Sequence, residues 1–213
     1  MVKEFLAALV IVSTTATVAF ADPPAVKVMA EPQVGDHWTY TQRDEITGQV
    51  KGTFTQTVTE VRDEDVGLRV SWPGKSTWLL IYDRNWNIKD SLSWRFLPSD
   101  GWGFQPPLAL GATWNFDVEQ KSRRGITLKG SRKGRVVGQS QLTTRIGRFD
   151  AFEVEVNFTN ERGDSSEEEG AVRSWYAPAI NHWVKRVIEK RRNGRLMSKE
   201  TEELTDYGRR EGN

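Results

Sequence analysis

Cysteine is absent from the 213-residue chain. Without a thiol the protein can form no disulfide, bind no metal through a thiolate and use no cysteine nucleophile. The chain also lacks the cysteine that carries the lipid of a bacterial lipoprotein, so we expect it not to be lipidated. The hydrophobic core alone must then stabilise the fold.

Histidine is scarce, and the familiar catalytic motifs are missing. His37 and His182 are the two histidines, and neither has the His-x-His or His-x3-His spacing of a metal site. We therefore expect both at strand ends on the surface. The chain also has no Gly-x-Ser-x-Gly, P-loop or dinucleotide-binding motif. These absences favour a protein that is not an enzyme and that uses no cofactor and no metal.

Net charge is small, at +1, and gives no reason to expect a nucleic-acid partner. One stretch is nevertheless basic, because residues 121–135 contain no acidic residue. Its cations form a candidate basic patch for anionic lipid headgroups or a polyanionic wall polymer, namely Arg123, Arg124, Lys129, Arg132, Lys133 and Arg135. The alternative is ordinary exposed strand faces, whose Lys and Arg side chains guard sheet edges.

Long apolar runs are missing except at the N-terminus. Residues 5–21 are apolar or small throughout and end in Ala19-Phe20-Ala21, the pattern of a signal-peptidase site. We therefore expect a signal peptide over 1–21 and a single domain over 22–213. The alternative is an uncleaved membrane anchor, for which this run is short. Export without cysteine is typical of the bacterial periplasm. We expect a periplasmic or secreted protein that is not an integral membrane protein.

Much of the remaining sequence alternates with the period of two that is typical of half-buried strands. In 152–158 the apolar residues share one face and the polar residues share the other. The same pattern runs through 86–96. Residues 78–82 are continuously apolar instead, which predicts a strand covered on both faces or placed at the centre of a sheet.

Turn signals separate these segments at short intervals. Asn193-Gly194 is the strongest hairpin signal, although the residues before it, 183–188, also fit a helical stripe. The spacing of the turns predicts a mainly antiparallel β fold of roughly ten strands. We expect a curved sheet or an open or half-closed β-barrel.

A short motif, aliphatic-Gly-x-x-Trp-x-aromatic, occurs twice. It reads VGDHWTY at 34–40 and LGATWNF at 110–116, and a Trp-x7-Trp pair follows in each half of the chain. The repetition predicts an internally duplicated β-meander with halves 34–97 and 110–204, in which Trp38 and Trp114 are buried counterparts. The alternative is that the motif marks strand entry twice by chance.

Two further stretches resemble a known family. Residues 146–154 (IGRFDAFEV) contain a Gly-x-Phe-Asp-x-aromatic strand entry, and 174–178 (SWYAP) precede Trp183-Val184-Lys185. Over 138–204 the chain thereby resembles domain of unknown function family 3108, a family of bacterial periplasmic β-rich proteins. Where that family often has a glycine after the proline, this chain has Ile-Asn-His. The resemblance implies an open or half-closed barrel similar to lipoprotein-carrier folds, and it carries no catalytic residue.

Nine tryptophans supply large, partly polar surfaces for a core or for a ligand. The segment 97–108 is rich in Pro and Gly and contains Trp102 and Phe104, which either plug the core or form the lip of a ligand site. Together with Trp86 and Trp94, they are the candidate ligand-binding residues.

The preferred hypothesis is an exported, non-enzymatic protein that binds an apolar or amphipathic envelope component, or an envelope protein, in its concave face. The alternative is a carbohydrate or cell-wall-polymer binding module that uses exposed tryptophans as stacking platforms. A hydrolase is a third alternative, which no motif supports. A lined cavity would favour the first function, and a row of solvent-facing rings would favour the second.

Overall fold

The computed structural model describes residues 29–161 and 167–209. The expected signal peptide and the expected start of the mature chain at Asp22 lie outside these residues. Within the described part, no helix has the length and hydropathy that a membrane crossing requires.

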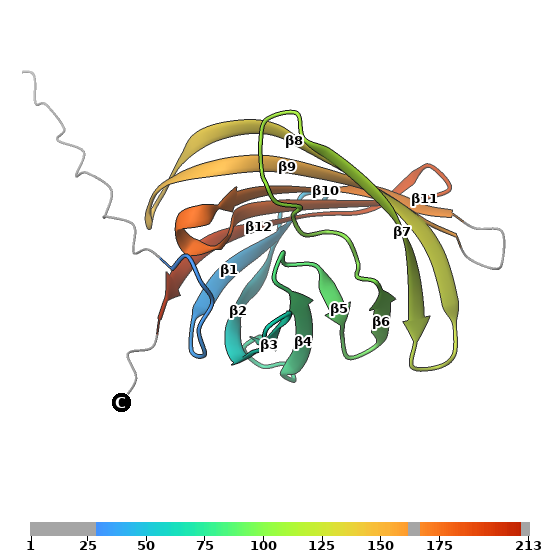
Figure 1. The fold of residues 1–213 in the computed structure, drawn as a ribbon, viewed down its shortest axis with the longest axis horizontal. Helices are drawn as coiled ribbons and strands as arrows, with labels where there is room; N and C mark the ends of the chain where they lie inside the picture. The colour runs from blue at the N-terminus through green and yellow to red at the C-terminus, as the bar shows by residue number, and fades with distance from the viewer. Residues whose placement is uncertain (1–28, 162–166, 210–213) are drawn as a thin grey trace, which may run out of the picture.

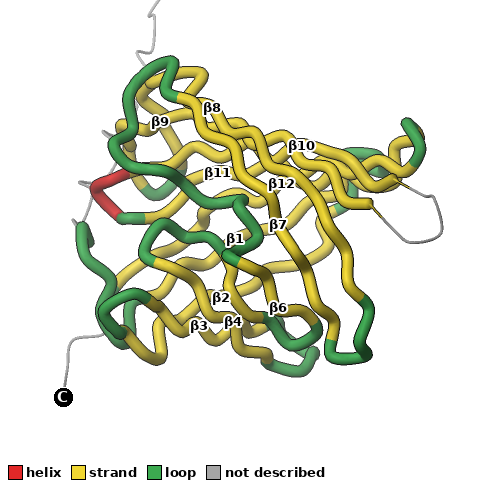
Figure 2. The backbone as a smooth tube through the Cα atoms, turned by 45° about the vertical axis from the view of Figure 1, so that its right-hand side comes forward, coloured by secondary structure: helices red, strands yellow, loops and turns green. Residues whose placement is uncertain are grey.

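The described residues form twelve antiparallel strands, which close into a barrel (Figures 1 and 2). Each strand pairs with its neighbours in sequence. A 3-10 turn, η1 (Pro178–Ile180), lies between the tenth and eleventh strands. The strands are β1 (His37–Asp44), β2 (Val50–Val61), β3 (Asp65–Ser71), β4 (Trp78–Asp83), β5 (Ile88–Asp90), β6 (Trp94–Leu97), β7 (Thr113–Ser122), β8 (Thr127–Thr144), β9 (Gly147–Glu161), β10 (Glu167–Ala177), β11 (His182–Arg192) and β12 (Arg195–Gly208).

The barrel closes because its last strand pairs with its first. β1 and β12 are in register from His37 opposite Gly208 to Asp44 opposite Glu200. The expected antiparallel β-barrel is therefore confirmed, with twelve strands where the turn count predicted roughly ten. The barrel is closed, whereas the sequence suggested an open or half-closed one.

The hydrophobic core fills the barrel interior, because inward and outward positions alternate along each strand. In β9, Val154, Val156 and Phe158 are buried while Asn157 is exposed, so the face predicted for this stretch is confirmed. Residues 183–188 belong to strand β11, and the helical alternative is wrong. Asn193 and Gly194 both have positive φ, as expected for the predicted hairpin turn between β11 and β12.

The barrel wall is uneven in height (Figure 1). β8 and β9 have 18 and 15 residues, whereas β5 and β6 have 3 and 4. The alternation of 86–96 does not form one continuous strand. Trp86 sits in a turn with φ of 62°, and Leu92 is 67% exposed in the turn between β5 and β6.

β4 corrects another prediction. Its residues Leu79 and Ile81 are 63% and 39% exposed, although the apolar run at 78–82 predicted cover on both faces or a sheet centre. The wall of the barrel is a single layer here, so one side of β4 faces solvent while Tyr82 faces the core.

The segment between β6 and β7 turns into the barrel. Its residues Ser99, Asp100 and Phe104 are buried, and we call residues 98–107 the plug. The Gly103 N–H donates to Asn87 Oδ1 at 2.8 Å, which fixes the plug to the turn before β5.

Candidate ligand site in the barrel interior

A row of aromatic rings leads from a partly exposed position into the core. Trp72 stacks on Phe54 with ring centroids 5.3 Å apart, Phe54 stacks on Tyr40 at 5.4 Å, and Tyr40 stacks on Trp183 at 5.7 Å. We call these four rings the aromatic row. The Arg186 guanidinium lies over the last ring, with Cζ 3.4 Å from the Trp183 centroid. Trp72 is half-buried and the other three rings are buried, so the row connects solvent to the interior.

Local backbone geometry explains how the row forms. Tyr40 and Phe54 are cross-strand partners on β1 and β2, which places both rings on the inner face. Gly52 has φ of 142°, and a Cβ there would lie 3.0 Å from the Trp72 ring, so glycine leaves room for that ring. The Tyr40 hydroxyl donates to the Trp183 carbonyl oxygen at 2.8 Å and joins β1 to β11.

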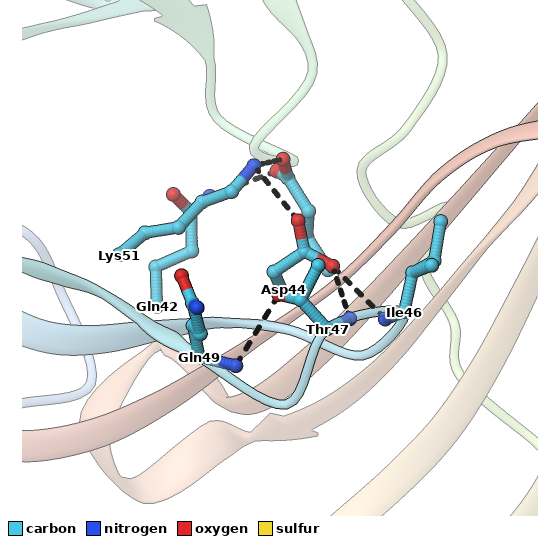
Figure 3. Close-up of polar contacts among 7 residues, drawn as sticks. Gln42, Asp44, Ile46, Thr47, Gln49 and Lys51 are labelled. Carbon is cyan, nitrogen blue, oxygen red and sulfur yellow. Dashed lines mark hydrogen bonds and ion pairs between the residues drawn. The ribbon is translucent and has the colours of Figure 1, made fainter.

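A polar rim lies at the exposed end of the row, beside the β1–β2 turn (Figure 3). The Gln42 amide donates to Glu200 Oε2 at 3.0 Å, and Lys51 Nζ lies between Glu200 and Asp44. Gln42 is opposite Gly52 in the β1–β2 register, which places the rim next to Trp72. The hydrogen bond to Glu200 raises the pKa of Lys51, so this amine stays charged.

Polar side chains occupy the other end of the row. Arg186 Nε donates to Ser174 Oγ at 3.0 Å, and Glu202 is the cross-strand neighbour of Arg186 on β12. Gln56 is buried next to Phe54 along β2. We call Gln56, Ser174, Arg186 and Glu202 the polar floor. None of the four is more than 8% exposed.

Several buried polar atoms of the interior have no partner. Among the described residues, the buried side-chain atoms without a hydrogen bond are Gln56 Oε1, Trp102 Nε1, His182 Nε2, Trp183 Nε1 and Arg186 Nη2. Each unsatisfied buried group costs about 1–3 kcal/mol. Such atoms in native proteins are satisfied by bound water or by a ligand. Two of these N–H donors, on Trp183 and Arg186, belong to side chains in direct contact.

Burial changes the charge of the polar floor. It raises the pKa of Glu202 to about 7; Arg186 opposes the rise, Glu200 adds to it, and the nearby Trp183 side chain opposes it slightly. Burial also raises the pKa of Tyr82, which lies within electrostatic range of Arg186 and Glu202. Among the described residues, Arg186 forms no ion pair, so its charge is not directly balanced.

His182 is fully buried, which corrects the expectation of a surface histidine. Its ring centroid lies 4.3 Å from that of Trp38 and 3.8 Å from that of Trp183. The Tyr40 hydroxyl donates its one proton to the carbonyl oxygen of Trp183. His182 Nδ1 must therefore be the donor to the Tyr40 oxygen, 2.6 Å away. Burial, and then Arg186, lowers the pKa of His182 well below its usual value and keeps the ring neutral.

The other histidine matches its prediction. His37 begins β1, is partly exposed and lies 3.3 Å from Asp206. No group of three or more His, Cys, Asp or Glu side chains within residues 29–161 and 167–209 is placed to hold a metal ion.

Two of the candidate ligand-binding aromatics lie in the core. Trp86 is 2% exposed, and its indole N–H donates to Asn181 Oδ1 at 3.1 Å. Phe104 is also 2% exposed and packs on Tyr176 with centroids 4.3 Å apart. Phe104 therefore has the plug role that the sequence left open, and neither ring faces solvent.

The other two candidates are half-buried. Trp102 packs on Phe158, with ring centroids 5.3 Å apart, and Lys190 Nζ lies 5.4 Å from its ring centroid. Trp94 lies at the start of β6. The structure brings two of the four candidates together: the Phe104 N–H donates to the carbonyl oxygen of Asn85, the residue before Trp86, at 2.8 Å. Trp102 packs elsewhere, on Phe158, and Trp94 is on the wall, so the four do not form one site.

The candidate basic patch is also divided. Arg132 is 1% exposed and points into the barrel, where its Nε donates to the Asp100 carbonyl oxygen at 2.7 Å. The other cations are on the outside, where acids on neighbouring strands interrupt them. Lys129, for example, has Glu119 opposite on β7 and Glu161 opposite on β9.

Sequence reasoning missed the polar floor. Alternation from Trp183 predicts that Lys185 points inward and Arg186 outward. A bulge reverses this parity, because Tyr176 pairs with Trp183 while Trp175 pairs with Lys185. Glu202 could have been found, since it has the same parity as the apolar Leu204 two residues later.

Comparisons with known proteins identify the fold. A structure of a proposed lipoprotein from Parabacteroides distasonis superposes with a TM-score of 0.53 at 13% identity, covering 85% of this chain and 99% of that one. A proposed exported protein with a YmcC-like fold, from Bacteroides fragilis, gives 0.52 at 12% identity, covering 87% and 100%. The hypothetical lipoprotein YmcC from Escherichia coli gives 0.49 at 11% identity, covering 81% and 85%.

These likenesses concern the fold, which is similar to the YmcC-like fold of exported proteins. No protein-family model matches the chain, and no curated protein matches it either.

Proposed function

We propose that this chain is an exported, non-enzymatic protein of the bacterial envelope that binds an amphipathic envelope component inside its barrel. The observation that carries the proposal is the aromatic row, which runs from the half-exposed Trp72 to unpartnered donors on Trp183 and Arg186. Apolar walls with a few convergent polar groups are typical of small-molecule sites.

The proposed site has a place for each part of such a ligand. The Trp72 and Phe54 rings would contact the apolar part of the ligand at the outer end of the aromatic row, and the polar floor offers hydrogen bonds further in. The exported proteins with a similar fold support envelope localisation. We also propose that the chain is related to domain of unknown function family 3108. An envelope protein is the alternative binding partner.

The carbohydrate-binding alternative has less support. All nine tryptophans lie in the described part of the chain, and none of them is fully exposed. Trp175 is an outward-facing example, since it pairs with Glu153 and Lys185 on the outer wall. A stacking platform needs a row of solvent-facing rings, which the described residues do not present.

The first test is native mass spectrometry of the full chain purified from its own periplasm. We expect a co-purifying amphipathic molecule of defined mass. A protein without such a molecule, which also fails to take up a fluorescent lipid analogue, would contradict the proposal.

The second test compares two tryptophan variants. Trp72→Ala should weaken binding of the fluorescent lipid analogue by about tenfold, which corresponds to roughly 1.4 kcal/mol. Trp175→Ala removes a half-buried ring from the outer wall and should leave binding unchanged. Equal affinities of the two variants would argue against a ligand in the barrel, and the opposite order would favour carbohydrate stacking.

A further inference from the structure

We propose that the polar floor and the adjoining Trp183 recognise an anionic oxygen group, a carboxylate or a phosphate, through Arg186 Nη2 and Trp183 Nε1. This inference rests on the proposed function and specifies the chemistry of the ligand's polar end.

The two donors are held in place before any ligand binds. Arg186 is fixed on one side by the Trp183 ring at 3.4 Å and on another by the hydrogen bond from its Nε to Ser174 Oγ. The Trp183 ring is held by contacts with the rings of Tyr40 and His182, whose centroids lie 5.7 and 3.8 Å from its own. Arg186 Nη2 remains without an acceptor, and Trp183 Nε1 has none within hydrogen-bond distance. The Trp183 side chain nevertheless lies close enough to Glu202 to lower the pKa of that acid, so Arg186 Nη2 is the freer of the two donors. Donors that need no rearrangement bind an acceptor at a lower entropic cost.

Both free groups select an acceptor. A guanidinium and an indole N–H can donate hydrogen bonds but cannot accept them. Burying a guanidinium is also unfavourable unless a negative charge or hydrogen bonds compensate it. A water molecule would accept the hydrogen bonds but would not offset the positive charge. A carboxylate or a phosphate would do both.

Neither of the two nearby acids accepts a hydrogen bond from Arg186 Nη2. Asp100 of the plug accepts the backbone N–H groups of Ile88 and Trp102 at 2.8 and 3.1 Å, which commits its Oδ1. Glu202 is beside Arg186, but burial raises the pKa of Glu202 to about 7, so much of it is protonated at neutral pH.

The remaining titratable groups that face Arg186 are neutral. Burial raises the pKa of Tyr40 and of Tyr82, and it lowers the pKa of His182. The charges that act on Arg186 at neutral pH are therefore those of Asp100, whose pKa burial raises to about 6, and of the ionised fraction of Glu202. Neither acid accepts a hydrogen bond from Arg186 Nη2, which stays available to a ligand.

The test uses the full mature chain and four probes that share one alkyl tail: dodecanoate, dodecyl phosphate, dodecanol and dodecyltrimethylammonium. Isothermal titration at neutral pH, supported by native mass spectrometry, measures each affinity. We expect at least one of the two anionic probes to bind about tenfold or more tightly than dodecanol, and the cationic probe to bind most weakly. Comparing dodecanoate with dodecyl phosphate identifies the source of the oxygen group.

Three variants test the named atoms. Arg186→Gln should reduce the preference for the anionic probes over dodecanol to about twofold or less. Trp183→Phe keeps a stacking ring but removes the N–H, and it should reduce the same preference by a smaller factor. Arg69→Gln makes the same chemical change as Arg186→Gln on the exposed outer wall and should change nothing.

The outcomes separate the two proposals. If dodecanol binds as tightly as the anionic probes, or if Arg186→Gln leaves the preference intact, the anionic subsite is wrong while binding in the barrel stands. If none of the probes binds, both proposals fail. If Arg186→Gln does not fold, as judged by circular dichroism, the wild-type probe series and Trp183→Phe decide the question.

Discussion

Asp36 shows how one residue fastens the two ends of the described chain together. It is fully buried just before β1, and Arg209 contacts its two carboxylate oxygens at 2.7 and 2.9 Å. The Gln33 N–H donates to the same carboxylate at 2.8 Å. Since β12 ends at Gly208, this ion pair holds the final strand against the first.

Removing one member of this pair should be costly. Arg209→Ala leaves a buried carboxylate without its cation, and we expect a loss of about 2 kcal/mol in the free energy of unfolding. Arg62→Ala is the control, because Arg62 and its partner Glu60 are 65% and 54% exposed and such surface pairs contribute less than about 1 kcal/mol. Urea unfolding of the three proteins measures both effects. Similar losses in the two variants would contradict the role of Asp36.

Glu202 should make stability depend on pH. Burial raises its pKa to about 7 from an ordinary value of 4.5. Between these values the native state binds more protons than the unfolded chain, so its contribution to stability falls as the pH rises from about 4.5 to about 7. A shift of this size corresponds to at most roughly 3 kcal/mol.

The variant Glu202→Gln isolates this effect from that of Asp100, whose burial raises its pKa to about 6 and acts in the same direction. We expect the variant to gain stability relative to wild type at about pH 8 compared with about pH 5, as measured by urea unfolding. Glu119→Gln on the outer wall, where Lys121 lowers the pKa of Glu119, should show no such gain. If the free energy of unfolding depends on pH in the same way for the wild-type protein and the Glu202→Gln variant, the prediction is wrong.

At the scale of the elements, a segment could be predicted where inward-facing and outward-facing residues alternate without interruption by a turn or a bulge. The face at 152–158 and the hairpin at 193–194 could be predicted because alternation and turn chemistry are local properties. The segment at 86–96 could not be predicted from alternation, because Trp86 lies in a turn closed by Asp83, whose side chain accepts the N–H groups of Asn85 and Asn87. The alternation of apolar residues masked this turn. The bulge beside Trp183 likewise hid Arg186 from pattern analysis.

The plug should tolerate no side chain at Gly103. A Cβ there would lie 2.2 Å from the Asn85 carbonyl oxygen, and a backbone atom cannot give way easily. Gly103→Ala should therefore cost about 1–3 kcal/mol, as overpacking usually does. Gly138→Ala in β8 is the control, since its Cβ would make only ordinary contacts at 3.4 Å with Glu153. Urea melts together with limited proteolysis of the plug would test this, and equal behaviour of the two variants would contradict it.

The repeated motif forms the same turn in both places. The Gly35 N–H donates to the Val58 carbonyl oxygen at 2.9 Å, and the Gly111 N–H donates to that of Val136 at the same distance. The two glycines have φ of 93° and 83°. This match explains why the motif begins a strand twice, and the duplication of the whole meander stays a prediction.

The two motif tryptophans are not equally buried, which changes the expected cost of removing them. Trp38 is fully buried, whereas Trp114 is half-buried across Gly134. Trp38→Ala should cost about 3–5 kcal/mol, the usual penalty for emptying a large aromatic site, and Trp114→Ala roughly half of that. Urea unfolding checks the order, and a larger loss for Trp114→Ala would contradict this assignment.

At the scale of the whole molecule, closure of the barrel could not be predicted from local pattern. The β1–β12 pairing joins residues at opposite ends of the domain, such as His37 and Gly208, and no periodicity encodes a contact at that separation. The site has the same origin. Its aromatic row crosses β1, β2 and β11 and exists only once those strands have been brought together.

A closed barrel must open somewhere to admit a ligand, and the wall at β5 and β6 is the weakest part. These two strands share one register pair, Asp90 opposite Arg95, whereas β8 and β9 share fifteen. The ion pairs from Asp90 to Arg95 and Arg123 add little, because both arginines are more than 65% exposed. We therefore expect local opening at this wall to cost far less free energy than unfolding of the barrel.

Amide hydrogen exchange followed by mass spectrometry would measure this difference. Amides of β5 and β6 should exchange at least about tenfold faster than those of β9, because each amide exchanges through the local opening that has the lowest free energy. The plug supplies part of the remaining protection, since Ile88 exchanges two hydrogen bonds with Asp100. Gly103→Ala, which strains the plug, should therefore accelerate exchange in β5 further while leaving β9 unchanged, and Gly138→Ala should affect neither. Equal protection of β5 and β9 in the wild-type protein would show that this wall does not open separately, and a ligand would then have to enter past the polar rim at Lys51 and Glu200.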